Sequence, residues 1–276
     1  MSASRSALSV CTLVAVVGVA GSAAHAQLIR SGSSADAAGL TALVDQYRAD
    51  LGDLNANEPG TVGSGRRQIN WDAAPDFISA PNAFPGDFFN FPANPRARGV
   101  EFTTPGTGFQ LSATSASGEG VNFSNIDPSY ADEFSTFSPE RLFTAIDSNV
   151  VEVNFFVPGS SQPATTTGFG AVFSDVDDYG STTIEYFDAD GALLDTYLVE
   201  AGPTDQGSLS FFGLSYGEAI IGSVRITAGN QALGGPEMGL ADLVVMDDFI
   251  FGEPVPAPGA LALAGVAALA TARRRR

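Results

Sequence analysis

Apolar and polar residues alternate in short runs over most of the chain. In residues 150–157 every second position is apolar, while Glu152 and Asn154 occupy positions between them, the period of a half-buried strand. Asp190 and Gly191 mark a hairpin, since glycine tolerates the positive φ of tight turns. Short strands without alternating helices predict a single antiparallel β-sandwich, jelly-roll-like, over residues 66–253. The other strand-like runs are 109–113, 169–173, 182–187, 193–199, 209–214, 224–227 and 243–251.

A helical period replaces this alternation near the start of the chain. One apolar stripe predicts an N-terminal amphipathic helix that packs on its own domain, with docking to a partner as the alternative. Ser34 is the expected N-cap, and Gly52 or Asn55 the expected end. Residues 27–65 should hold a polar stretch at 28–34, this helix and a linker. The stripe comprises Leu40, Leu43, Val44, Tyr47, Leu51 and Leu54.

Residues 71–98 follow neither period. Five prolines stand among five phenylalanines there, and proline excludes a central strand. We expect a long ordered loop whose phenylalanines plug the sandwich. A platform of aromatic rings for a ligand is the alternative. The phenylalanines are Phe77, Phe84, Phe88, Phe89 and Phe91.

The last strand carries two adjacent acids between apolar residues. Strict alternation places Asp248 with Val244, Met246 and Ile250, and Asp247 with Val245, Phe249 and Phe251. One aspartate therefore faces apolar surroundings, where a carboxylate needs a counter-charge or donors unless an edge position leaves it solvated. The expected counter-charges are Arg66, Arg67 or Arg225, or a metal ion.

Calcium is the metal that suits such a site, because it takes oxygen ligands. First and last strands of a sandwich often lie side by side, so residues beside Trp71 are the expected co-ligands. The predicted metal site consists of Asp247, Asp248, Asn70 and Asp72.

Each end of the chain contains an apolar run. Residues 1–26 hold one arginine, an apolar run at 8–20 and a small-residue site with Ala24 and Ala26, the layout of a cleavable signal peptide. Residues 254–276 hold a proline-rich spacer, a 14-residue apolar segment and four arginines. As a helix that segment spans roughly 21 Å, short of the roughly 30 Å hydrocarbon core. Its arginines should stay cytoplasmic, leaving the preceding chain outside.

The last residues resemble the PEP-CTERM sorting signal of exported bacterial proteins. The family's Pro-Glu-Pro is replaced by Pro256, Ala257 and Pro258. The resemblance implies processing by a membrane-bound exosortase, transient insertion of the tail and an association with exopolysaccharide. It assigns the sorting role to Pro256, Pro258, Arg273, Arg274, Arg275 and Arg276.

Three further stretches resemble pieces of exported proteins with lectin-like or jelly-roll ectodomains. This resemblance implies a fold and a location, and no catalytic residues. The stretches are 65–72, 168–177 and 246–254.

The amino-acid composition limits the kinds of catalysis and metal binding that the chain can support. The only cysteine is Cys11 and the only histidine is His25, and lysine is absent. Outside the signal, catalysis through imidazole, thiolate or lysine is therefore excluded, as are metal sites built on His or Cys. Without Arg5 and the four terminal arginines, eight basic residues face 31 acids, a net charge of −23. That charge argues against nucleic acid as a partner.

The carboxylates of Asp and Glu remain as possible catalytic groups or metal ligands. Turn formation is the expected role of Asp175, Asp177 and Asp178, and of Asp188 with Asp190. No acid pair resembles a glycosidase arrangement. We therefore expect a non-enzymatic surface or matrix protein associated with exopolysaccharide. The alternatives are a carboxylate-dependent carbohydrate hydrolase and a purely structural coat protein.

Overall fold

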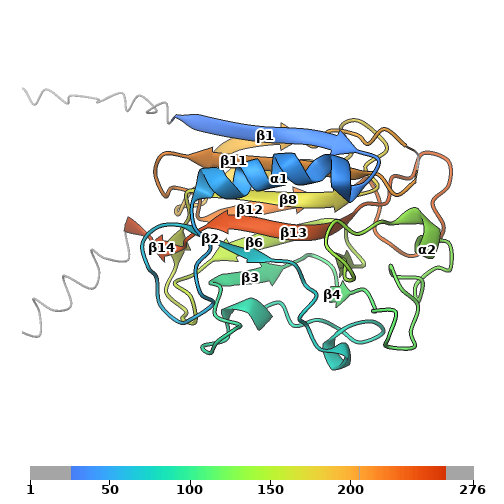
Figure 1. Ribbon diagram of the computed structural model, residues 1–276, viewed down its shortest axis with the longest axis horizontal. Helices are drawn as coiled ribbons and strands as arrows, with labels where there is room; N and C mark the ends of the chain where they lie inside the picture. The colour runs from blue at the N-terminus through green and yellow to red at the C-terminus, as the bar shows by residue number, and fades with distance from the viewer. Residues whose placement is uncertain (1–25, 205, 259–276) are drawn as a thin grey trace, which may run out of the picture.

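The computed structural model describes residues 26–204 and 206–258 and consists of two packed antiparallel β-sheets (Figure 1). The predicted β-sandwich is confirmed. The first sheet has the order β1 (Gln27–Ser34), β11 (Leu209–Tyr216), β8 (Gly168–Ser174), β13 (Val245–Gly252), β5 (Phe143–Ile146) and β4 (Gly108–Leu111), and β2 (Arg66–Ile69) also pairs with β13. The second has the order β10 (Leu193–Leu198), β9 (Thr183–Phe187), β12 (Ser223–Thr227), β6 (Val150–Phe155) and β3 (Val100–Thr103).

Strand burial follows the position of each strand in the layers. In β6, Val151, Val153 and Phe155 are buried and the residues between them are partly exposed, as the alternation predicts. By contrast, β8, β11 and β13 are buried at every position. One face of these strands meets the core between the sheets, and the helix α1 (Ala37–Leu51) covers much of the other. The hairpin at Asp190 and Gly191 is confirmed between β9 and β10.

The helix packs through the predicted stripe. Leu40, Val44, Tyr47 and Leu51 are buried against β8, β11 and β13. The Tyr47 hydroxyl donates to the Leu214 carbonyl at 2.8 Å. A Cβ at Gly213 would lie 2.8 Å from the Tyr47 ring, so this glycine allows the close approach of helix and sheet.

The start of the domain holds a strand that the polar stretch did not indicate, and the expected N-cap is wrong. The polar stretch at 28–34 is strand β1, whose eight residues pair with β11. Ser34 therefore ends a strand, and the N-cap is Asp36, whose side chain accepts the Gly39 N–H at 2.9 Å. The helix ends at Gly52, with φ 92°, as expected.

Only some of the aromatic side chains of the loop at 71–98 fill the core. Phe84 and Phe89 are buried in the main core around Trp71. Phe77, in the short helix η1 (Asp76–Ile78), is 76% exposed, and Phe91, after η2 (Phe88–Asn90), is 48% exposed. The loop therefore has an inner aromatic layer and an outer one.

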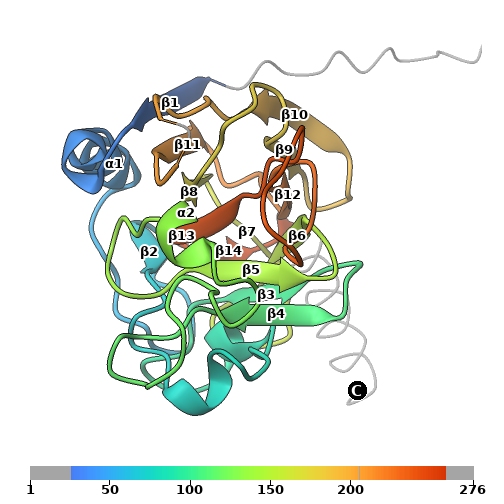
Figure 2. The same ribbon diagram turned by 90° about the vertical axis from the view of Figure 1, so that its right-hand side faces the viewer.

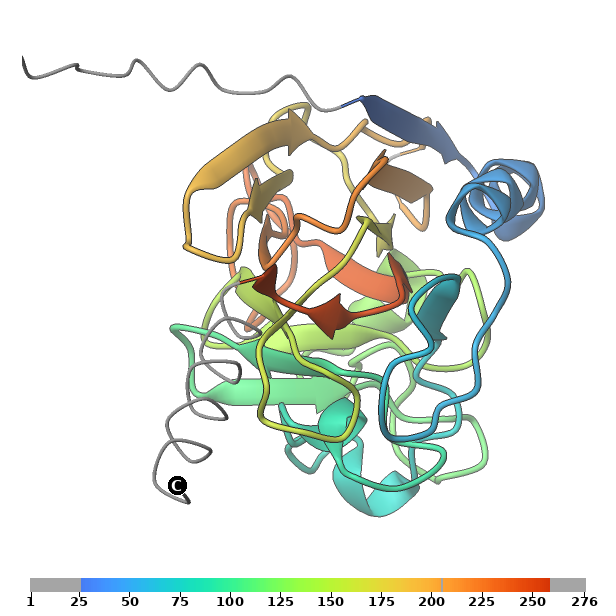
Figure 3. The same ribbon diagram turned by 90° about the vertical axis from the view of Figure 1, so that its left-hand side faces the viewer.

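The short elements mark the two ends of the sandwich. Figure 2 looks onto the end that carries α2 (Tyr130–Glu133), and Figure 3 onto the end with β14 (Val255–Pro256), which pairs with β7 (Ala164–Thr165). Pro256 lies in this pair, while Ala24 and the arginines at 273–276 lie outside the described residues. Within 26–204 and 206–258, no helix has the length and apolar character needed to cross a bilayer.

Candidate functional site

A β-bulge in β13 alters the alternation on which the site was predicted. The register with β8 shifts between Met246 and Phe249, so Asp247 and Asp248 occupy the irregular positions. Met246 and Phe249 consequently face the same core between the sheets, while Ile250 lies under the helix. The prediction that Phe249 and Phe251 share a face with Val245 is wrong, because an extra residue in one strand resets its period.

The structure brings together the four residues of the predicted metal site. Strand β2 pairs with β13, and the chain just after β2 carries Asn70 and Asp72. The hydroxyl of Ser138 lies within 2.6 Å of Asp248 Oδ1, 3.3 Å of Asp247 Oδ1 and 3.5 Å of Asp72 Oδ2. Asn70 Nδ2 donates to Asp72 Oδ2 at 2.9 Å. We call these five residues the aspartate cluster.

Donors of the protein compensate the two buried aspartates of this cluster. Arg48, on the helix, donates to Asp248 Oδ2 at 2.6 Å. The backbone N–H groups of Phe137 and Ser138 donate to Asp247 Oδ2 at 2.6 and 3.1 Å. Burial raises the pKa of Asp248, and the bonds from Ser138 and Arg48 offset part of that rise. Burial and the adjacent Asp248 carboxylate raise the pKa of Asp247 well above its usual range. Asp248 thus has a cation as partner, and Asp247 has two backbone donors.

None of the three arginines expected as counter-charges pairs with Asp247 or Asp248 in the described chain. Arg67 pairs with Glu253 at 2.7 Å, and both side chains are fully buried. Arg225 pairs with Glu152 on the surface of the second sheet, and Arg66 bonds the Gly52 carbonyl. The prediction missed Arg48 because only the packing of the helix on β13 brings it to the aspartates.

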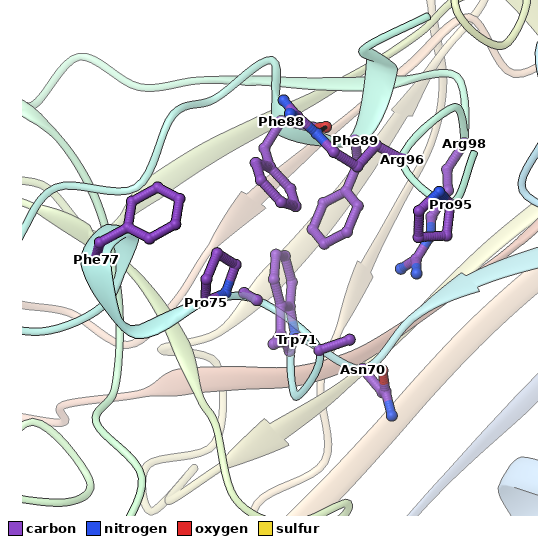
Figure 4. Close-up of a pocket in the computed structure, with 11 residues that line it drawn as sticks. Asn70, Trp71, Pro75, Phe77, Phe88, Phe89, Pro95, Arg96 and Arg98 are labelled. Carbon is purple, nitrogen blue, oxygen red and sulfur yellow. Dashed lines mark hydrogen bonds between the residues drawn. The ribbon is translucent and has the colours of Figure 1, made fainter. Parts of the chain in front are cut away.

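A pocket of about 270 Å³ opens beside Trp71 in the loop at 71–98 (Figure 4). Phe77 lies at one side of the hollow and Arg98 at the other, with the Trp71 indole and the Phe89 ring between them. The lining includes no carboxylate. It consists of Asn70, Trp71, Ala73, Ala74, Pro75, Phe77, Phe88, Phe89, Pro95, Arg96 and Arg98.

The two arginines of this pocket differ from most others in the protein. The Arg96 guanidinium lies 4.1 Å from the ring centres of both Phe88 and Phe91, and that of Arg98 lies 4.5 Å from that of Phe89. Within the described part of the chain neither forms an ion pair, whereas Arg30, Arg48, Arg67, Arg141 and Arg225 do.

Arg98 is the more buried of the two, with 9% of its surface exposed. Its Nε is buried and has no hydrogen-bond partner within the described segments. Burial, together with the charge of Arg67, lowers the pKa of Arg98 to about 10. At neutral pH the side chain is still a cation, and it lines the pocket without a countercharge.

A second group of acids lies at the end of the sandwich that carries α2. Carboxylate oxygens of Glu133, Asp175 and Glu237 lie within 4.8 Å of one another. We call these three residues the acid triad. The sequence does not indicate this triad, because the three residues are far apart in the chain and Asp175 fits a turn. The only local signal is that Asp175 directly follows a strand that is apolar at most positions.

Comparisons with models of protein families, with curated proteins and with solved structures found no match for this chain.

Proposed function

We propose that this chain is an exported surface or extracellular-matrix protein that binds an acidic polysaccharide in the pocket beside Trp71 without cleaving it. The observation that carries this proposal is the position of Arg96 and Arg98. In a chain with 31 acids and 13 basic residues, both point to one aromatic pocket and neither forms an ion pair among the described residues. A ligand with a carboxylate supplies the missing partner. The net negative charge of the protein repels an anionic polymer as a whole, but salt screens this repulsion over about 10 Å, whereas the two guanidinium groups act at contact distance.

The pocket matches the two kinds of surface that a uronic acid presents. A guanidinium offers a planar fork of donors that fits a carboxylate, and such charge-assisted bonds are among the strongest in proteins. The C–H faces of a sugar ring pack against aromatic rings, and exposed Phe77 in the pocket lining offers such a ring.

Two other functions have less support. A hydrolase with a pair of acids needs carboxylates on either side of the bond that it cleaves, and the pocket lining has none. Asp247 and Asp248 are buried beneath the helix and bonded to Arg48 and Ser138. A coat protein needs no concave site with unpaired arginines.

Export and sorting of the chain belong to the same proposal and rest on its two ends. The signal-like residues 1–26 and the PEP-CTERM-like tail favour secretion, exosortase processing and retention near exopolysaccharide. Pro256 pairs with Ala164 in the small sheet, and the Ala257 N–H donates to the Pro163 carbonyl at 3.1 Å. The proposed sorting motif therefore starts directly against the folded domain.

Binding to two soluble polymers tests the function. We expect the purified protein to bind polygalacturonate and to bind neutral dextran at least tenfold more weakly. Arg98→Met or Arg96→Met should weaken polygalacturonate binding by about tenfold or more, since a hydrogen bond to a charged group contributes roughly 1.5–3 kcal/mol. Titration calorimetry at two salt concentrations measures both effects.

Arg30→Met is the matched control, because Arg30 forms a surface ion pair with Asp50 away from the pocket. Its affinity for polygalacturonate should equal that of the parent. Equal binding of both polymers would contradict the role of the arginines. Release of new reducing ends from either polymer would favour the hydrolase instead.

A further inference from the structure

The acid triad joins three segments that are distant in the sequence. Glu133 is the last residue of α2, Asp175 follows β8, and Glu237 belongs to the loop that leads into β13. Asp175 is fully buried, Glu133 is 8% exposed and Glu237 is half-buried. Three carboxylates of one sign therefore meet where little water reaches them.

Two carboxylate oxygens of the triad lack a donor. Asp175 Oδ1 accepts the Gly207 N–H at 3.0 Å, and Glu237 Oε1 accepts the Leu243 N–H at 3.2 Å. The second oxygens, Asp175 Oδ2 and Glu237 Oε2, are buried without any hydrogen-bond partner in the described residues. A buried polar atom without a partner costs about 1–3 kcal/mol, and such atoms are rare unless a ligand or water completes them.

The surroundings add negative charge and no cation. Within the described ranges no ion pair includes a triad residue. Burial first, and then the charges of Asp177, Glu133 and Glu237, raise the pKa of Asp175 to about 9. Burial, the close Glu133 carboxyl group and the nearby acids raise the pKa of Glu237 to about 8. Three buried or half-buried carboxylates whose oxygens lie within 4.8 Å of one another need a positive partner when they are ionised.

We propose that Glu133, Asp175 and Glu237 bind a calcium ion. Calcium takes six to eight oxygen ligands in a flexible arrangement, and carboxylates on loops provide them. Zinc prefers nitrogen and sulfur ligands, and the triad offers oxygen alone. Magnesium holds several waters and demands a strict octahedron, whereas these carboxylates come from three separate segments. This site is distinct from the pocket and does not rest on polysaccharide binding.

The ion has a structural task. Outside the signal-like segment the chain has no cysteine, so no disulfide can tie its loops together. A calcium ion on the triad links α2, the end of β8 and the long loop before β13. It does at one end of the sandwich what a disulfide does in other exported proteins.

Thermal unfolding and calorimetry test the site. The purified full-length protein should bind calcium chloride with a dissociation constant of about 10⁻⁴–10⁻³ M, the range of extracellular modules. At a hundredfold excess over that constant, the unfolding midpoint should rise by about 5–10 °C relative to the protein in chelator. Asp175→Asn and Glu237→Gln should each abolish most of this rise.

Asp132→Asn is the matched control, because Asp132 is an exposed neighbour of Glu133 outside the triad. It should retain the full rise. Identical midpoints in calcium and in chelator, with no heat of binding, would overturn the proposal and leave protons shared among the acids as the explanation. A rise that persists in Asp175→Asn and Glu237→Gln would also overturn it, as would a rise lost in Asp132→Asn.

Discussion

The aspartate cluster and the acid triad contain the same kind of buried acid in opposite surroundings. Asp248 of the cluster receives a guanidinium and a hydroxyl, and Asp247 receives two backbone N–H groups. In the triad, Asp175 and Glu237 each receive one backbone N–H and retain a buried oxygen without a partner in the described chain. Burial of a carboxylate therefore does not by itself indicate a metal site. The number of hydrogen-bond donors and cations around the carboxylate distinguishes the two regions.

The largest loss of stability should follow from removal of Arg48, the helix residue that pairs with Asp248 of the cluster. Arg48→Met leaves Asp248 buried without its cation, and breaking a buried pair from one side costs about 3 kcal/mol or more. Urea unfolding should show this loss in chelator as well as in calcium. Arg225→Met is the control, because it breaks an exposed pair with Glu152 and should cost less than about 1 kcal/mol. Equal losses in both variants would mean that the cluster is no better coupled than the surface.

A smaller change in the free energy of unfolding, of opposite sign, is expected for a variant of the triad. In chelator, Asp175→Asn removes an acid without a cation, so the variant should be more stable than the parent by about 1–2 kcal/mol. Asp248→Asn should instead lower stability, since it weakens the bond to Arg48. Urea unfolding of both variants in chelator provides the comparison. A loss of stability in Asp175→Asn would show that the ionised acid is compensated there too.

The smallest effect concerns pH. Burial first, and then the charge of Asp248, raise the pKa of Asp72 from 3.8 to about 6. The folded protein thus binds this proton more tightly than the unfolded chain. The stability from this group is complete below 3.8 and is lost as the pH rises through about 6. Midpoints of parent and Asp72→Asn should diverge over this window and run parallel above it. Parallel curves throughout would mean that Asp72 ionises at its ordinary pH.

Strand periodicity predicted most of the sandwich, because most of its strands have at least one face in the core. These are β6, β8, β9, β11, β12 and β13. The short strands β3 and β5 were missed, since four residues such as Val100–Thr103 hold too few alternations to stand out. Strand β1 was missed for another reason. Its residues are polar or partly exposed, and its pairing with β11 rather than burial makes it a strand.

Of the candidate sites, only the aspartate cluster was predictable, because it depends on which strands are neighbours. The expected adjacency of first and last strands brought Asn70 and Asp72 to Asp247 and Asp248, and β2 does pair with β13. The bulge at these aspartates has no periodic signature, so the faces were assigned wrongly. The triad and the arginine pocket depend on loop packing between residues distant in sequence, which local patterns do not encode.

Under the proposed function, in which the tail holds the protein on a surface, the pairing of β14 with β7 also sets the orientation of the domain. The small sheet lies at one end of the sandwich and α2 at the other. A tether that leaves the domain after Pro256 turns the small-sheet end toward its support. The acid triad, beside α2, is then presented outward, to the medium from which calcium arrives. An antibody against the α2 end should label intact cells, while one against the β7–β14 end should be shielded.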